Sequence, residues 1–504
     1  MKYSVLILAL LLIFSCKKEK TKTDYLGVVN ITISGKEKAI PHFEKGLLLL
    51  HSFEYEDARE EFIKAQEEDP NMPMSYWGEA MTYNHSLWGE QNYDSGIAAL
   101  KHIEDIELDK YATELESDFI KAAQILYQPK MEKPERDMAY ANFMEELSER
   151  YPSNHEVAAF YALSLLGSVP EGRDDAIYGK GARIAKGVLE ENPNHPGALH
   201  YLIHSYDDPN HAPLALEAAN SYSKIAPDAS HALHMPSHIY VAMGMWKEVV
   251  SSNINSYQAS LNRMNRKGLD NDARGYHAYH WLEYGRLQDS KNEEAKKMVL
   301  DMQQYATETP SKKGRLHLVY LKGTYLVETN DWDGDIAEIP VDISDLNVTI
   351  RSQYHFLEGM KAFVKNDSNL LDSIIDLTEK DYQRESFVVS NNNSKICSAV
   401  SRAEASKTDL IESKIRQTQL RALRASLDND KTLAETYFLE SIELEESISY
   451  SYGPPAIQKP TRELYADWLL TQNKNQEAAT QYEITLKSAP KRLLALKGIE
   501  KAKG

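Results

Sequence analysis

Paired helical patterns of apolar and small residues recur at four places along the chain. In the stretch 39–70, Gly46, Ala58 and Phe62 stand at spacings that suit two amphipathic helices, and Pro70 follows the second helix. Two helices joined by a short turn, with small residues where they cross, account for these spacings. Comparable patterns return near 73–100, 196–227 and 465–490. Such units bury apolar surface against their neighbours, so the chain needs no single large core.

These spacings resemble the tetratricopeptide (TPR) repeat, a helix pair with a period of about 34 residues. The resemblance implies an all-α fold, a right-handed solenoid of TPR-like helix-turn-helix units. Because the segment 328–348 interrupts the helical periodicity, we predict an irregular connector there. It would separate an N-terminal array over 39–327 from a C-terminal array over 349–504. Solenoids of this kind present concave surfaces, so the resemblance also implies a peptide or protein partner in the groove.

The N-terminus resembles a bacterial lipoprotein signal. A basic residue, Lys2, precedes an apolar run from Val5 to Phe14, and the small residue Ser15 stands before Cys16. We predict a signal peptide over 1–15, lipidation of Cys16, and a polar tether over 16–38. The protein would then be lipid-anchored in the bacterial cell envelope, on the periplasmic or the cell-surface face of the outer membrane.

The charge balance excludes one class of partner. The chain has 57 basic and 76 acidic side chains, a formal net charge of −19. Because such a surface repels phosphates, we expect no nucleic-acid partner.

Histidines are concentrated in one part of the predicted N-terminal array. Nine of the sixteen histidines lie between His195 and His280, although the chain has 504 residues. Besides the pair His277 and His280, two sets within this part have the i,i+3 or i,i+4 spacing that places side chains on one face of a helix. These residues are His200 and His204, then His231, His234 and His238. In the TPR register both sets fall on first helices, which line the inner groove and lie side by side.

Neutral imidazole is a good ligand for zinc and copper, and ligands on rigid helices form a pre-organised site. We therefore predict that these five histidines bind a transition metal, zinc or copper. Further ligands could come from His277, His280, His51, His85 and Glu283. Pro236 lies within the second set, and we expect it either to begin the helix or to bend it.

Three functions remain open from the sequence. The first is an envelope-anchored TPR lipoprotein whose histidine-rich groove binds a metal or a metal-bound ligand. The second is a protein-interaction scaffold without metal, and the third is a glycan-capture lipoprotein of the SusD type. We assign no enzymatic activity, since the His-Glu-x-x-His motif is absent, and any catalysis in this groove would depend on the metal.

Overall fold

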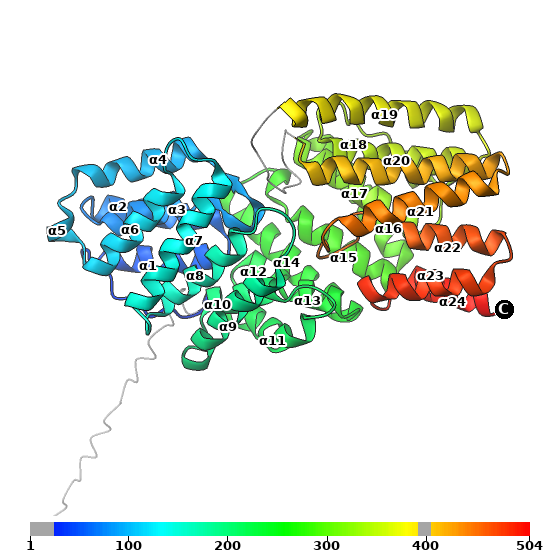
Figure 1. The fold of residues 1–504 in the computed structure, drawn as a ribbon. Coiled ribbons are helices and arrows are strands. Elements are labelled where there is room, and N and C mark those ends of the chain that lie inside the picture. Colours follow the sequence, from blue (N-terminus) through cyan, green and yellow to red (C-terminus); the bar gives the residue numbers. More distant parts are fainter. Residues whose placement is uncertain (1–24, 392–404) are drawn as a thin grey trace, which may run out of the picture.

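The computed structural model describes residues 25–391 and 405–504. Figure 1 shows an elongated stack of helices, with the N-terminal helices (blue to cyan) at one end and α18–α24 (yellow to red) at the other. The helices up to residue 267 are α1 (Ile40–His51), α2 (Tyr55–Glu68), α3 (Pro73–Met81), α4 (Tyr93–Lys101), α5 (Leu108–Tyr111), α6 (Glu114–Leu126), α7 (Lys133–Arg150), α8 (His155–Gly167), α9 (Asp175–Glu191), α10 (Pro196–Ser205), α11 (Leu216–Ile225), α12 (Ser230–His234), α13 (Pro236–Ala242) and α14 (Trp246–Lys267).

The remaining helices are α15 (Tyr276–Gln288), α16 (Asn292–Glu308), α17 (Lys312–Thr329), α18 (Val348–Val364), α19 (Ser368–Asn391), α20 (Lys407–Leu427), α21 (Lys431–Ser447), α22 (Thr461–Thr471), α23 (Asn475–Ser488) and α24 (Leu493–Lys503). Within the described ranges, β-structure is limited to one two-residue hairpin, β1 (Asn84–His85) with β2 (Glu90–Gln91).

Consecutive helices pack as hairpins, and neighbouring hairpins pack on one another; α1 with α2, α8 with α9 and α22 with α23 are examples. The predicted all-α helical-repeat solenoid is therefore confirmed. Its helix crossings depend on small residues, as the sequence indicates. A Cβ atom on Gly46 would lie 2.8 Å from the ring of Phe62, so only glycine permits this approach of α1 to α2.

Two hydrophobic cores meet at α15. The first core runs from Leu26 to Tyr284 and the second from Tyr276 to Ala495, so side chains of α15 contribute to both. The predicted connector 328–348 joins α17 to α18 and contains a short 3₁₀ turn, η6 (Asp335–Glu338). Its side chains Trp332 and Ile336 are buried in the second core.

The described part of the predicted tether, residues 25–38, lies against the body. The Val28 N–H donates to the carbonyl of Asn194 at 2.9 Å, and the Ser34 hydroxyl donates to Glu116 at 2.7 Å. Leu26 is buried in the first core. This stretch is polar on average, but it contains a few apolar side chains. Their burial holds the stretch against the body.

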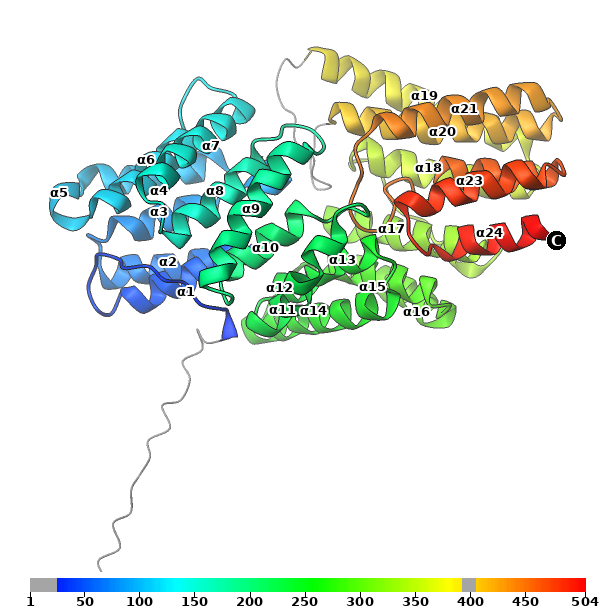
Figure 2. The ribbon, with the colours of Figure 1, turned by 60° about the horizontal axis from the view of Figure 1, so that its bottom comes forward.

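Loops of the C-terminal half contact α15 and α17, and Figure 2 shows the C-terminal helices from a second direction. The buried Arg492 guanidinium pairs with Glu463 at 2.8 Å and with Glu328 at 2.6 Å, and it donates to the Tyr284 hydroxyl of α15 at 3.1 Å. As a result, the loop between α21 and α22 reaches α15, where Gly453 lies against Trp281.

The predicted signal peptide 1–15 and lipidation residue Cys16 lie outside the described residues. Among the helices of the described ranges, none combines the length and the apolar character needed to cross a bilayer.

Candidate metal centre

The start of α10 sets the positions of His200 and His204. The Nδ1 atom of His195 accepts a hydrogen bond from the backbone N–H of Ala198 at 3.2 Å and so caps the helix. Pro196 occupies the first helical position, where its missing N–H costs nothing. His200 and His204 follow four residues apart on one buried face of this helix.

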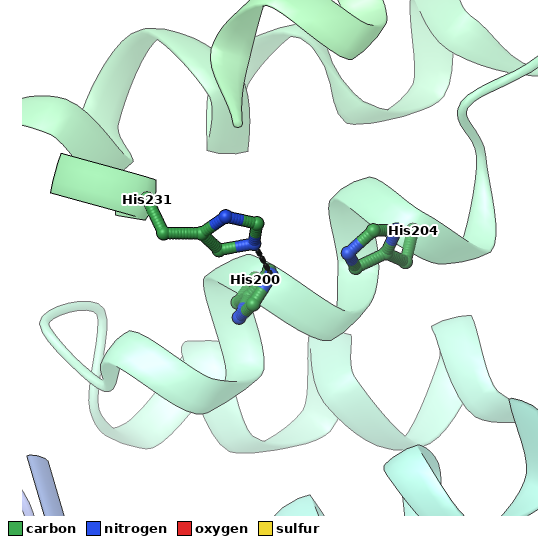
Figure 3. A group of neighbouring side chains, drawn as sticks. All are labelled: His200, His204 and His231. Atoms are coloured by element: carbon green, nitrogen blue, oxygen red, sulfur yellow. Dashed lines mark hydrogen bonds between the residues drawn. The ribbon is translucent and has the colours of Figure 1, made fainter. Parts of the chain in front are cut away.

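His231 of α12 meets His200 across the gap between the two helices. Their Nε2 atoms lie 3.2 Å apart, with the rings turned toward each other, and His204 lies on the next turn of α10 (Figure 3). Two nitrogens bound to one tetrahedral ion at about 2.1 Å are separated by about 3.4 Å. The His200–His231 pair already has the separation of two ligands on one metal ion.

Pro236 bends the chain inside the second histidine set, which is one of the two outcomes expected from the sequence. Helix α12 ends at His234 and α13 begins at Pro236, with Met235 between them. The break separates His231 and His234 from His238, which lies on α13. His238 consequently approaches His204, and their ring centroids are 5.3 Å apart.

Four of these rings donate a hydrogen bond from Nδ1–H to an acceptor of the protein. The Nδ1–H groups of His204 and His238 both donate to Oδ2 of Asp207, at 3.3 and 3.2 Å. The His200 Nδ1–H donates to the backbone carbonyl of His51 at 2.7 Å. In the same way, the His234 Nδ1–H donates to Oδ1 of Asn253 at 2.7 Å.

A proton on Nδ1 leaves the lone pair of a neutral imidazole on Nε2. The structure therefore directs ligand lone pairs into the space between α10, α12 and α13. Carboxylates and carbonyls that accept from the far nitrogen of a histidine are the usual partners of metal-bound imidazoles, because they fix the ring and raise its basicity.

Burial lowers the pKa of several of these imidazoles. It lowers the pKa of His234 to about 3, helped by the neighbouring His238. The pKa of His200 is also lowered by burial and by the proximity of other histidines, chiefly His204. For Asp207, burial alone would raise the pKa, but hydrogen bonds from His204 and His238 outweigh it and lower the pKa. Near neutral pH the cluster thus combines neutral imidazoles with a buried carboxylate.

Two buried ring nitrogens of the cluster have no hydrogen-bond partner in the part of the chain that the structure describes. The Nε2 atoms of His204 and His234 are buried and unpaired among residues 25–391 and 405–504. The two side chains are only 5% and 2% exposed, respectively. An unpaired buried polar atom costs about 1–3 kcal/mol, so a ligand that satisfies these nitrogens would stabilise the fold.

His277 of α15 completes a second group of histidines. Its ring centroid lies 4.7 Å from that of His234, and ligand atoms of His234, His238 and His277 all lie within 4.8 Å of one another. Ligand atoms of His200, His204 and His231 satisfy the same limit. Nitrogens bound to one ion at about 2.1 Å are at most about 4.2 Å apart, so each group needs little or no movement to hold an ion.

The histidines of the centre differ in exposure. His200, His204, His234 and His238 are buried, whereas His231 is half-buried and His277 is exposed. On the C-terminal side, Tyr452 packs against His238 with a centroid separation of 5.0 Å, and Trp281 stacks on His238 at 4.6 Å. The imidazole cluster therefore packs against aromatic side chains and includes two histidines that are not fully buried.

The other suggested ligands lie apart from this centre. His85 stacks on Tyr55, and the Nε2 atom of His280 is hydrogen-bonded to Thr324 at 2.9 Å. Glu283 is fully buried, and neither carboxylate oxygen has a hydrogen-bond partner in the part of the chain that the structure describes. Burial and the nearby Glu328 raise the pKa of Glu283.

His51 belongs to a separate buried group with Glu156 and His195. The Glu156 carboxylate accepts from His51 at 2.7 Å and from His195 at 3.1 Å, while His51 is also bonded to Tyr201 at 2.9 Å. Because these atoms already satisfy one another, we interpret this group as a structural network. It fixes the His51 carbonyl that holds His200.

Sequence reasoning missed Asn253, Trp281, Tyr452 and Glu156. Asp207 has no spacing in the sequence that distinguishes it from other carboxylates near the histidines. Asn253 and Trp281 lie on helices that only the tertiary fold brings to the cluster, and Tyr452 arrives from the C-terminal half. Spacing along the sequence does not reveal these four residues. Only knowledge of the contacts between repeats could have identified them.

No protein-family description matches the sequence, and no curated protein matches it. Solved structures with a similar helical arrangement include yeast Tom70, at 13% identity and a TM-score of 0.30, over 93% of this chain and 89% of that one. Another is the Rap protein complexed with Competence and Sporulation Factor, at 11% identity and a TM-score of 0.37, over 82% and 99%. A third is the human IFIT1 dimer, at 10% identity and a TM-score of 0.38, over 94% and 95%. The likeness is one of general helical architecture, so the function is sought in this chain's own side chains.

Proposed function

We propose that this protein binds a transition-metal ion, zinc or copper, through the imidazole cluster of α10, α12, α13 and α15. One observation carries the proposal: Nδ1 atoms are engaged by protein acceptors, while the buried Nε2 atoms of His204 and His234 have no partner within the described residues. In a purely structural cluster, both nitrogens of a buried ring would be paired with protein groups.

The donor set favours these two metals. It consists of neutral nitrogen ligands, with the carboxylate of Asp207 behind two of them. Imidazole suits zinc and copper, whereas magnesium and calcium prefer oxygen. Metal binding would replace the hydrogen bond between the Nε2 atoms of His200 and His231, since both nitrogens would then turn their lone pairs to the ion.

In this proposal the metal centre is carried by a lipid-anchored envelope protein. The anchor rests on the sequence around Cys16 alone. A Cys16→Ser variant should move from the membrane fraction to the soluble fraction of the cell. Retention of the variant on the membrane would contradict the anchor without affecting the metal centre.

The metal proposal is tested on the full chain purified in mild detergent. Metal analysis should find zinc or copper, and adding either ion to chelator-treated protein should raise its melting temperature. The double variant His234→Gln and His238→Gln should bind less metal, whereas His211→Gln, outside the cluster, should bind as the parent does.

If the parent protein neither contains nor binds zinc or copper, the proposal is wrong. The alternative of a peptide-binding scaffold without metal would then apply. In that case the double variant should change partner binding alone.

A further inference from the structure

The six imidazoles of the centre form two groups of three that share no residue, and a further group of His204, Asp207 and His238 joins one ring of each. Ligand atoms of His200, His204 and His231 lie within 4.8 Å of one another, and so do those of His234, His238 and His277. Nitrogens bound to the same ion at about 2.1 Å can be at most about 4.2 Å apart. A four-coordinate ion has room for at most four of the six rings.

Each group contains its own unsatisfied buried nitrogen. His204 Nε2 belongs to the first group and His234 Nε2 to the second, and neither has a hydrogen-bond partner within residues 25–391 and 405–504. One ion in the first group would leave His234 unpaired, because its Nδ1 is already bonded to Asn253. One ion in each group would satisfy both nitrogens.

Each group also contains one histidine that is less buried than the other two. His231 is half-buried and His277 is exposed, whereas the other four rings are buried. Each group thus offers two buried ligands and a third that is more exposed. Three imidazoles leave a coordination position open on a four-coordinate ion, where water or a small ligand can bind.

Asp207 links the two groups. Its Oδ2 atom accepts from His204 of the first group at 3.3 Å and from His238 of the second at 3.2 Å. Its other oxygen lies 3.8 Å from the guanidinium of Arg173. One buried carboxylate therefore orients a ligand ring in each group and supplies negative charge between two cations.

We infer that the centre holds two transition-metal ions, one bound by His200, His204 and His231 and the other by His234, His238 and His277. This inference rests on the proposed function, since it presumes that the cluster binds metal at all. It adds the number of ions and the division of ligands between them.

The test is a titration of the chelator-treated full chain with Zn²⁺, and separately with Cu²⁺. The parent should bind two ions per chain. The His231→Gln variant removes a ligand of the first group only, and His277→Gln removes one of the second group only. Each variant should retain one tightly bound ion. The His280→Gln variant, on the same helix as His277 but bonded to Thr324, should still bind two.

Copper provides a second readout. Electron paramagnetic resonance of the parent with two equivalents of Cu²⁺ should show coupling between neighbouring ions. Either single variant with one equivalent should show the uncoupled signal of an isolated ion.

The outcomes separate the two hypotheses. A parent that binds one ion, lost in both His231→Gln and His277→Gln, would overturn the two-ion inference and leave the proposed function standing. One ion bound by the parent and lost in only one of these variants would also overturn it. A parent that binds no ion would overturn both. Circular dichroism spectra of the variants that match the parent would show that loss of metal is not loss of fold.

Discussion

Replacing Asp207 by asparagine tests how far the centre depends on its orienting carboxylate. The substitution keeps the shape of the side chain but removes the charge that two Nδ1–H groups share, those of His204 and His238. Loss of such a partner typically weakens metal binding by about 10–100-fold. At about 1.4 kcal/mol per tenfold, this corresponds to about 1.4–2.7 kcal/mol of binding free energy.

The assay is competition for Zn²⁺ between the protein and a coloured chelator at pH 7. The control is Asp208→Asn, because Asp208 also accepts from a histidine, His211 at 2.7 Å, which is not part of the cluster. We expect the affinity to fall in Asp207→Asn and to remain within about twofold of the parent in Asp208→Asn. Equal zinc affinities of the parent and the folded Asp207→Asn variant would refute the orienting role of this carboxylate.

Three further predictions concern stability. Burial, aided by His317, lowers the pKa of His280 to about 3. Below pH 6.5, His280 is therefore protonated in the unfolded chain but neutral in the folded chain. The free energy of unfolding should fall by up to about 1.4 kcal/mol per pH unit from this residue, and urea melts of the metal-free protein from pH 7 to 4 should show a shallower decline in His280→Gln. A Cβ atom on Gly197 would lie 2.4 Å from Nδ1 of His51, so Gly197→Ala should cost about 1–3 kcal/mol of stability in urea and weaken zinc binding. Gly187→Ala, which has open space around it, should do neither. Arg492→Leu leaves the buried Glu463 and Glu328 carboxylates without their cation and should cost about 3–5 kcal/mol in the same assay; a loss below about 1 kcal/mol would contradict their pairing.

The helix pairs were predictable because their information is local. Gly46 and Phe62 mark a crossing within one hairpin, and Pro196 marks the first position of a helix, so short-range spacing is enough to find them. The same holds for the shared face of His200 and His204, which follows from the helical period alone.

The pairing of His200 with His231 was only partly predictable. The repeat register places their helices side by side, but the 3.2 Å approach of the two rings depends on how α12 ends at the bend before Pro236. A proline in the sequence predicts a bend or a late start, and only the packed structure chooses between them.

The sequence could not tell which of the additional ligand candidates would join the cluster. The histidines concerned are His51, His85, His277 and His280. All four had spacings compatible with the groove, yet the structure brings only His277 into the cluster. His51 is held by Glu156, and His280 by Thr324, which belong to other helices. The partner of a buried imidazole is set by contacts between repeats, and a single sequence does not record them.

Periodicity and local steric limits are enough to predict the helix pairs, their stacking into a solenoid and the helix faces that carry histidines. The tertiary structure alone decided which histidines meet, that Asp207 lies between two groups of them, and that the C-terminal half places Tyr452 against His238. These features depend on the superhelical path and on the contacts between loops of the C-terminal half and α15. That path is the sum of many small packing angles between helices, to which residues far from the cluster contribute as much as the cluster itself.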